Sequence, residues 1–87
     1  MPKLTLFILP TCPYCIRVKQ YLNELVSEEP KYLNVEIELV DEKQNKQCAD
    51  RYDYYLVPTF YLGQTKLFEG IMDKEAVRKV LDTALAA

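Results

Sequence analysis

The chain has 87 residues, and it contains no histidine, no tryptophan, only two glycines and only three cysteines. Without histidine it cannot form a Cys–His or Ser–His catalytic pair, and it lacks the commonest protein ligand for metal ions. Three cysteines are too few for the disulfide framework of a small secreted domain, which needs a larger, even number. These absences favour cysteine chemistry that depends on neither a histidine base nor structural disulfides.

Long apolar runs and an excess of one charge are missing as well. Eleven basic and 13 acidic residues give a net charge of −2, so no basic field attracts nucleic acid or an anionic membrane. The apolar run of residues 4–9 is shorter than a signal-peptide core or a membrane span. We therefore expect a cytoplasmic protein with no nucleic-acid or membrane partner. In the reducing cytoplasm, two cysteines separated by two residues are more often catalytic than structural.

The pattern of apolar residues predicts a single α/β domain over residues 1–87, in which 49% hydrophobic residues fill one core. Asp41 and Asp73 are the expected N-caps of the second and third helices, and Gly63-Gln64 is the expected hairpin turn. The order β-α-β-α-β-β-α gives a four-stranded mixed sheet flanked by three helices, and we expect it to act as a monomer. The expected strands are residues 3–9, 35–39, 56–62 and 66–69, and the expected helices are residues 13–28, 41–52 and 74 onwards.

The most informative stretch is Cys12-Pro13-Tyr14-Cys15, between the first expected strand and the first expected helix. Cys12 fits the N-cap position, and Pro13 fits the first helical position, where its missing N–H is not needed. The unpaired N–H groups and partial positive charge of a helix N-terminus favour a thiolate over a thiol. Such motifs lower the pKa of the attacking cysteine from about 8.5 to roughly 3.5–7.5. Cys12 is therefore the candidate nucleophile, and Cys15, one turn along on the apolar face, is the candidate resolving thiol.

The element order, the place of the Cys-x-x-Cys motif and a proline near the start of the third expected strand together resemble the thioredoxin fold. Cys-Pro-Tyr-Cys itself, preceded by Phe7-Ile8-Leu9-Pro10-Thr11, resembles glutaredoxin, and the resemblance covers nearly the whole chain. It implies a cis peptide bond between Val57 and Pro58, with Pro58 facing the cysteines. It also implies that the Val57 backbone can pair with an extended substrate and that Tyr14 walls one side of the substrate groove.

The same resemblance implies a glutathione-binding site made of Pro13, Tyr14, Val57, Pro58, Gly70 and Asp73. The family carries a Gly-Gly pair before the aspartate, but in this chain Glu69 stands where the first glycine would be. The family also often carries a lysine or arginine for a glutathione carboxylate at the position that Leu9 occupies. Each departure weakens the binding of this anionic tripeptide by about 0.5–1.5 kcal/mol at an exposed site.

Other uses of the cysteines and tyrosines stay open at this point. Cys12 and Cys15 are half of a zinc site, but structural zinc usually takes four Cys or His ligands and only Cys48 remains. An iron–sulfur cluster shared between two subunits is a further use, although Pro13 works against it in the family. Cys48 is most simply a half-buried residue, with a regulatory thiol as the alternative. The neighbouring tyrosines favour the core edge and the sheet face over a stacking platform: Tyr52, Tyr54, Tyr55 and Tyr61.

Three functions follow from these residues and the resemblance. The first is a glutaredoxin-type oxidoreductase that reduces protein disulfides or glutathione mixed disulfides through Cys12 and Cys15, with no cofactor and with glutathione as co-substrate. Its reduction potential would lie at about −200 to −230 mV. The second is a thioredoxin-like reductase of the same mechanism, recharged by a flavoprotein reductase, which Leu9 and Glu69 favour. The third is a non-catalytic module that binds an iron–sulfur cluster or a partner protein.

Overall fold

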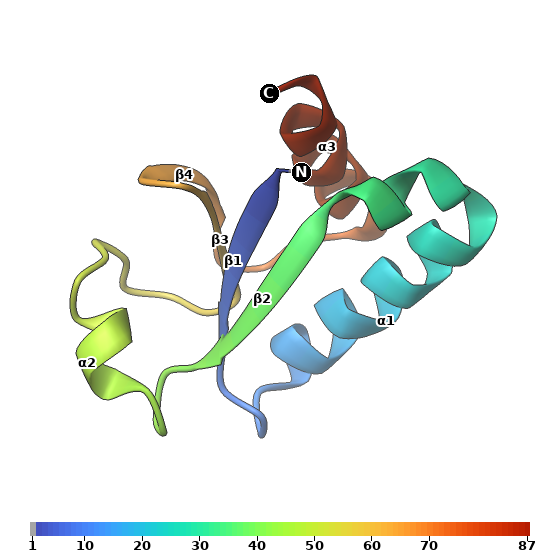
Figure 1. Ribbon diagram of the computed structural model, residues 1–87. Helices are drawn as coiled ribbons and strands as arrows, with labels where there is room; N and C mark the ends of the chain where they lie inside the picture. Colours follow the sequence, from blue (N-terminus) through green and yellow to red (C-terminus); the bar gives the residue numbers. More distant parts are fainter. Residues whose placement is uncertain (1) are drawn as a thin grey trace.

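The computed structural model describes residues 2–87 and contains the predicted four strands and three helices, together with one 3₁₀ helix (Figure 1). The predicted order β-α-β-α-β-β-α and the α/β fold class are therefore confirmed. In chain order the elements are β1 (Lys3–Ile8), α1 (Pro13–Glu28), the 3₁₀ helix η1 (Pro30–Asn34), β2 (Glu36–Asp41), α2 (Lys46–Ala49), β3 (Thr59–Leu62), β4 (Thr65–Glu69) and α3 (Lys74–Ala86).

The four strands form one mixed sheet in the order β2-β1-β3-β4. The central strand β1 is parallel to β2 and antiparallel to β3, and β3 and β4 form an antiparallel hairpin. The parallel pair is possible because α1 carries the chain back along the sheet between β1 and β2. The hairpin turns at Gly63, whose φ of 60° lies in the left-handed region that glycine adopts freely. The turn predicted at Gly63-Gln64 is thereby confirmed.

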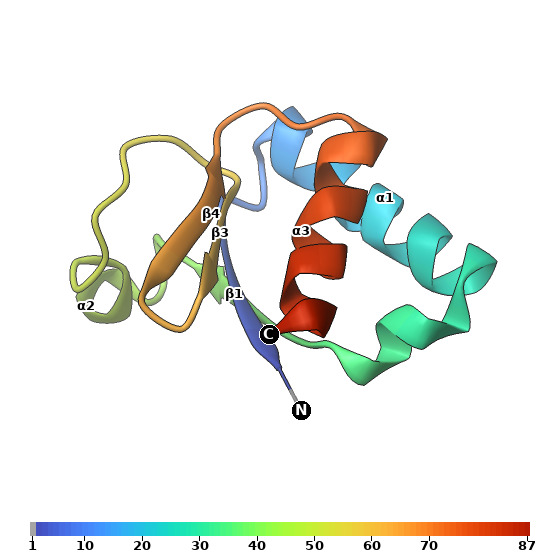
Figure 2. The same cartoon turned by 90° about the horizontal axis from the view of Figure 1, so that it is seen from above.

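Helices α1 and α3 cover one face of the sheet, and α2 lies on the other face (Figure 2). The larger part of the core lies under α1 and α3, whose buried residues recur at helical spacing. This regular spacing is the reason that the sequence pattern places both helices correctly. The buried residues are Cys15, Val18, Leu22 and Leu25 in α1, and Val77, Val80, Leu81 and Ala84 in α3.

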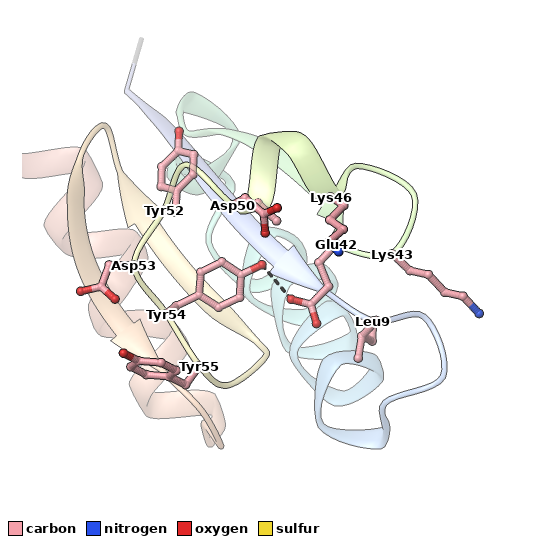
Figure 3. Close-up of a pocket in the computed structure, with 10 residues that line it drawn as sticks. Leu9, Glu42, Lys43, Lys46, Asp50, Tyr52, Asp53, Tyr54 and Tyr55 are labelled. Atoms are coloured by element: carbon pink, nitrogen blue, oxygen red, sulfur yellow. Dashed lines mark hydrogen bonds between the residues drawn. The ribbon is translucent and has the colours of Figure 1, made fainter.

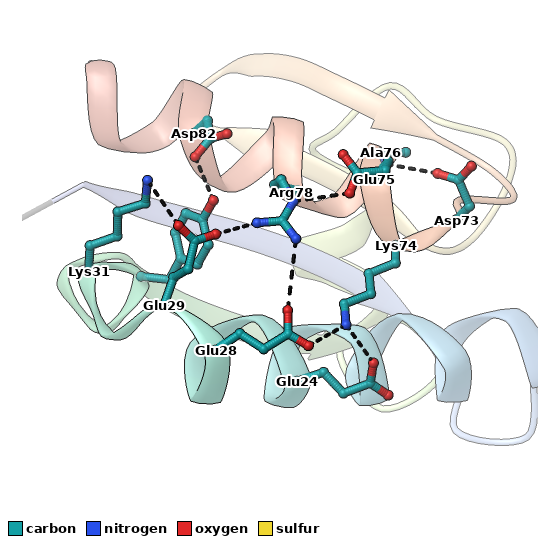
Figure 4. A network of polar contacts seen from close by, with 11 residues as sticks. Glu24, Glu28, Glu29, Lys31, Asp73, Lys74, Glu75, Ala76, Arg78 and Asp82 are labelled. Carbon is teal, nitrogen blue, oxygen red and sulfur yellow. Dashed lines mark hydrogen bonds and ion pairs between the residues drawn. The ribbon is translucent and has the colours of Figure 1, made fainter.

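Charged side chains join the outer sides of α1 and α3 (Figure 4). Exposed ion pairs contribute only about 0–1 kcal/mol each to the stability of the fold. The main effect of this network is therefore to orient α3 against α1. A stronger tie is the 2.7 Å hydrogen bond that the hydroxyl of Tyr32, a buried residue of η1, donates to Asp82. The ion pairs join Lys74 to Glu24 and Glu28, and Arg78 to Glu28, Glu29 and Glu75.

The second helix is much shorter than the sequence predicts, so the helix expected at residues 41–52 is wrong outside Lys46–Ala49. Asp41 does not cap it, because Asp41 still pairs with Ile8 in the sheet. Its carboxylate instead accepts the N–H groups of Lys43 and Gln44, at 2.9 and 3.3 Å, and closes a turn after β2. An aspartate serves a turn as well as a helix N-cap, and the strand pairing decides between them.

The third strand begins at Thr59, three residues later than expected. Pro58 has no N–H for the ladder, and the N–H groups of Tyr55 and Leu56 donate to the side chain of Glu69 instead of to a strand. The other strand ends differ from the expected ones by one or two residues, and η1 was not expected. No helix in the described part of the chain has the length and hydrophobicity that crossing a membrane requires.

Candidate active site

The predicted redox residues meet at one edge of the sheet, where β1 ends and β3 begins. Phe7 lies opposite Thr59 in this antiparallel pair, so the loop after β1 and the segment before Thr59 leave the sheet side by side. The parallel strand β2 ends at the same edge, with Asp41 opposite Ile8. The loop that leads to Cys12 is therefore a neighbour both of the segment before β3 and of the turn after β2.

Cys12 is the N-cap residue of α1, with an extended backbone (φ −78°, ψ 122°), and Pro13 follows at the first helical position. Its N–H donates to the Leu9 carbonyl at 3.0 Å. Partial burial raises the pKa of Cys12, but hydrogen bonds from the backbone and thiol of Cys15 and from the backbone of Tyr14 outweigh this effect. The pKa of Cys12 is therefore lowered, and this half-exposed thiol ionises first.

Cys15 lies in the first turn of α1, where only 1% of its surface is exposed. Burial raises the pKa of Cys15 to about 11, against a hydrogen bond with the Leu9 backbone that lowers it. The hydrogen bond and charge of Cys12, and more weakly the charge of Glu42, add to the rise. The two thiols therefore differ in exposure and in the direction of their pKa shifts, as an attacking and a resolving cysteine do.

The Val57–Pro58 peptide bond is cis, as the resemblance implies. Pro58 is buried, and its carbonyl accepts the N–H of Gly70 at 2.9 Å, which ties the end of β4 to this segment. Gly70 has a φ of 97°, a conformation that residues with a side chain rarely adopt. Within residues 2–87, neither the N–H nor the carbonyl of Val57 has a hydrogen-bond partner. These two backbone groups of Val57 are therefore available to another molecule.

Two residues of this edge, Glu42 and Tyr54, were missed by the sequence reasoning (Figure 3). Glu42 follows β2, and its N–H donates to the Ile8 carbonyl at 3.0 Å. The Tyr54 hydroxyl donates to Glu42 Oε2 at 2.7 Å, and burial together with this bond raises the pKa of Tyr54. Both residues line a cavity of about 550 Å³ that also includes Leu9. The signal that could have found Glu42 is that parallel strands end at a common edge.

The comparisons with known proteins agree with this geometry. Residues 3–82 match the family described as Thioredoxin domain. A thioredoxin from Methanocaldococcus jannaschii is 32% identical over 83 residues, which cover 95% of each chain. The chain belongs to the thioredoxin domain family. With its Cys-x-x-Cys pair at the start of α1, it is a thioredoxin-like thiol–disulfide oxidoreductase.

Solved structures share the thioredoxin fold. Oxidised thioredoxin from Plasmodium falciparum superposes with a TM-score of 0.73 at 17% identity, covering 99% of this chain and 82% of that one. A thioredoxin-like protein from Clostridium perfringens gives a TM-score of 0.68 at 25% identity, covering 97% and 71%. The family model and the relatives named here are thioredoxins or thioredoxin-like proteins, and the glutaredoxin interpretation of Cys-Pro-Tyr-Cys stays a prediction.

The residues expected to bind glutathione in this thioredoxin-family chain lie in different settings. Asp73 is the N-cap of α3, as predicted, and its carboxylate accepts the Ala76 N–H at 2.8 Å. Pro13 and Tyr14 lie exposed at the start of α1. Val57 and Pro58 lie just before β3 and Gly70 lies just after β4, and the hydrogen bond from the Gly70 N–H to the Pro58 carbonyl joins the two places. Large apolar side chains are exposed next to these residues and the dithiol: Tyr14, Ile16, Leu56 and Ile71.

Cys48 lies on the other face of the sheet from Cys12 and Cys15. It is half-buried against a small cluster that includes Phe7 under α2, so the prediction of a half-buried residue is confirmed. No group of three or more His, Cys, Asp or Glu residues among residues 2–87 could hold a metal ion. The tyrosines that pack around Phe7 confirm the prediction of a core edge, namely Tyr52, Tyr54 and Tyr61. Tyr55 departs from it, because 89% of its surface is exposed.

Proposed function

We propose that this protein reduces disulfide bonds in other proteins by two successive thiol–disulfide exchanges, and that a flavoprotein reductase restores its dithiol. The observation that carries the proposal is the contrast between the two thiols at the start of α1. Cys12 is half-exposed with a lowered pKa, whereas Cys15 is buried with a pKa raised to about 11. Only the thiolate attacks a disulfide, so Cys12 begins the reaction.

In the first exchange, the Cys12 thiolate attacks one sulfur of the substrate disulfide. A bond forms between Cys12 Sγ and that sulfur, and the other substrate sulfur leaves as a thiolate that takes up a proton. In the second exchange, Cys15 loses its proton and attacks Cys12 Sγ. The substrate's second sulfur leaves as a thiol, and the protein is left with a Cys12–Cys15 disulfide. The substrate gains two electrons and the protein loses two.

Protein substrates fit the surroundings of the dithiol better than small disulfides do. The free N–H and carbonyl of Val57 can pair with an extended substrate chain in the manner of an added strand. Exposed apolar side chains, among them Leu56 (59%) and Ile71 (67%), offer a surface that a substrate protein would bury. A reducing cytoplasm suits this direction of electron flow.

Glutathione as the donor is the second candidate, and it rests on the Cys-Pro-Tyr-Cys motif and its resemblance to glutaredoxin. Three observations weigh against it as the main reading. Leu9 offers no cation to a glutathione carboxylate, Glu69 adds a negative charge, and the carboxylate of Asp73 is engaged by its own helix. The family match to thioredoxin also supports the flavoprotein reductase.

A direct comparison of the two donors tests the proposal. The oxidised protein is offered either a flavoprotein thioredoxin reductase or glutathione with glutathione reductase, and the consumption of NADPH is followed. We expect faster reduction by the flavoprotein. Faster reduction by glutathione would reverse the assignment in favour of a glutaredoxin, and a visible absorbance band in the freshly purified protein would instead indicate an iron–sulfur module.

Single substitutions test the roles of the cysteines. We expect Cys12→Ser to abolish the reduction of a protein disulfide, because no thiolate remains to attack. We expect Cys15→Ser to accumulate the mixed disulfide at Cys12 and to keep some activity toward glutathione mixed disulfides, which need only one thiol. Equal loss of both activities in the two variants would contradict the assigned roles.

A further inference from the structure

Glu69, at the end of β4, holds the segment that precedes the cis proline. One oxygen of its carboxylate, Oε2, accepts the N–H groups of both Tyr55 and Leu56, the latter at 2.9 Å. The other oxygen, Oε1, accepts a 2.8 Å hydrogen bond from Lys66. No other side chain among residues 2–87 accepts a hydrogen bond from the backbone of this segment. Glu69 therefore holds the N–H groups of two consecutive residues of an otherwise irregular loop, and the Thr59 hydroxyl donates to the Leu56 carbonyl.

The backbone of β4 secures the same loop on its far side. Thr59 lies opposite Glu69 in the β3–β4 ladder, and the Gly70 N–H donates to the Pro58 carbonyl at 2.9 Å. Glu69, the last residue of β4, and Gly70, which follows it, thus hold the chain both before and after Val57. Val57 lies between these attachments and is the residue whose N–H and carbonyl are left without partners.

The negative charge of the Glu69 carboxylate strengthens its hydrogen bonds to the Tyr55 and Leu56 backbone. Hydrogen bonds from Lys66 and from the backbones of Tyr55 and Leu56 lower the pKa of Glu69 to about 2, so the side chain is ionised at any physiological pH. Hydrogen bonds to a charged acceptor are shorter and stronger than those to a neutral one. The side chain is also only 20% exposed, which limits competition from water.

We propose that Glu69 is a positioning residue that sets the register in which a substrate chain docks beside the dithiol, an inference that rests on the proposed function. Glu69 occupies the N–H groups of Tyr55 and Leu56, and the Thr59 hydroxyl donates to the Leu56 carbonyl, so Val57 is the one residue of 55–57 whose N–H and carbonyl are both free for an incoming strand. A substrate chain then has one register in which to pair, and the loop is already ordered before the substrate arrives. Because ordering a loop at an interface costs free energy on binding, this pre-organisation favours docking without touching the reacting sulfurs.

The test follows the first exchange in the reduced full-length protein with Cys48→Ser as the reference background, so that no donor enters and the half-buried Cys48 thiol releases no thiopyridone. Two disulfides with the same leaving group are compared: an extended octapeptide whose single cysteine is joined to thiopyridine, and methyl thiopyridyl disulfide. Attack by Cys12 on the alkyl sulfur releases thiopyridone in both cases, and its absorbance gives the rate. The concentration of peptide at half-maximal rate reports docking, whereas the small disulfide reports only the reactivity of Cys12.

We expect Glu69→Ala to raise the half-saturating peptide concentration by about tenfold, with the maximal rate and the rate for the small disulfide within about twofold of the wild type. Glu69→Met keeps the length and apolar stem of the side chain but accepts no hydrogen bond, so it carries the same expectation if Glu69→Ala folds poorly. Glu69→Gln retains an acceptor oxygen and should restore most of the docking. Lys66→Met removes only the ion pair and should leave docking close to that of the wild type.

Amide hydrogen exchange supplies the structural readout. We expect the Tyr55 and Leu56 amides to exchange slowly in the wild type and in Glu69→Gln, and quickly in Glu69→Ala and Glu69→Met. An unchanged half-saturating peptide concentration in the variants with fast exchange would overturn the positioning role while the reductase function stands. Fast exchange of both amides in the wild type would overturn the attachment itself. A wild-type protein that consumes neither disulfide would instead overturn the proposed function.

Discussion

The hydroxyl of Tyr54 donates a 2.7 Å hydrogen bond to the carboxylate of Glu42, and this bond joins the turn after β2 to the segment before Pro58. Glu42 follows β2 and is held by its N–H to Ile8, immediately before the loop that leads to Cys12. Tyr54 belongs to the segment that leads to the cis proline. The bond therefore couples the nucleophile's loop to the proposed docking segment, on the side opposite the contact that Glu69 makes.

The first prediction concerns the strength of this coupling. Tyr54→Phe should lower the free energy of unfolding by about 1 kcal/mol, because the ring still packs on Phe7 and only the hydrogen bond is lost. Tyr52→Phe is the matched control, since Tyr52 packs on the same ring and its hydroxyl donates to no group within residues 2–87. Urea unfolding of both variants measures the difference. Equal destabilisation by the two substitutions would show that the hydrogen bond is not the source.

The second prediction follows from the opposite shifts of the two thiols. In a Cys48→Ser background, alkylation of Cys12 by iodoacetamide should reach half its maximal rate at a lower pH than alkylation of a free cysteine, because the pKa of Cys12 is lowered. When Cys12→Ser is added to this background, burial still raises the pKa of Cys15 although the contribution of Cys12 is lost, so Cys15 should reach half its maximal rate at a higher pH than Cys12 does. Alkylation rates followed by mass spectrometry over a pH series give both profiles. Profiles that coincide would contradict the division of roles.

Glu42 offers a refinement of the same measurement. Its negative charge contributes to the raised pKa of Cys15, so Glu42→Gln should lower that pKa and shift the alkylation profile of Cys15 to lower pH. The control is Glu38→Gln, which removes an exposed carboxylate of β2 that pairs with Lys3 at 3.5 Å. If both substitutions shift the profile equally, the effect is one of net charge and not of proximity.

The sequence alone predicted the fold wherever a regular pattern repeated. The helical spacing of Val18, Leu22 and Leu25 and the Cys-Pro start of α1 were sufficient for that helix. Where one polar residue serves two kinds of structure, the pattern was ambiguous, and Asp41 closed a turn instead of capping a helix. The start of β3 was also misplaced, because the fate of the Leu56 N–H depends on Glu69, 13 residues further along the chain.

The candidate site divides in the same way. Cys12, Cys15 and the segment at Pro58 could be placed because a short motif and a resemblance carried them. Glu42 and Tyr54 could not, since they come together only through the parallel pairing of β1 with β2 and the irregular segment after α2. Glu69 was noticed as a departure from a glycine, but its contact with the Tyr55 and Leu56 backbone depends on the β3–β4 register.

The third prediction tests the glutathione alternative at Leu9. Leu9→Lys should lower the KM for a glutathionylated peptide, because the new ammonium group can pair with a glutathione carboxylate beside the dithiol. The same peptide without glutathione, presented as a methyl disulfide, serves as the control and should show no such gain. The nearby Glu42 competes for the new charge, so the double variant with Glu42→Gln should show a larger gain. An unchanged KM in both variants would place the glutathione groove elsewhere.

The fourth prediction concerns stability at low pH and again depends on Glu69. Its pKa is lowered from 4.5 to about 2, first by the hydrogen bond from Lys66 and then by the backbones of Tyr55 and Leu56. The unfolded chain therefore binds a proton at this position before the folded chain does. The stabilisation is complete above about pH 4.5 and is lost progressively as the pH falls toward about 2.

Urea unfolding at a series of pH values over this window measures the loss directly. The side chain in Glu69→Gln has no proton to bind, so the free energy of unfolding of this variant should fall less steeply with decreasing pH than that of the wild type. The difference between the two slopes should correspond to about one bound proton. In Lys66→Met, the loss of stability should end at a higher pH than in the wild type. The reason is that Lys66 is the largest cause of the lowered pKa of Glu69, and without it that pKa moves back toward 4.5. Glu28, whose pKa is also lowered, is present in all three proteins and cancels in the comparison. Parallel curves for the wild type and Glu69→Gln would mean that Glu69 has the same pKa in the folded and unfolded chains. The hydrogen bonds from Tyr55 and Leu56 would then not favour the ionised carboxylate of Glu69, which would contradict this prediction.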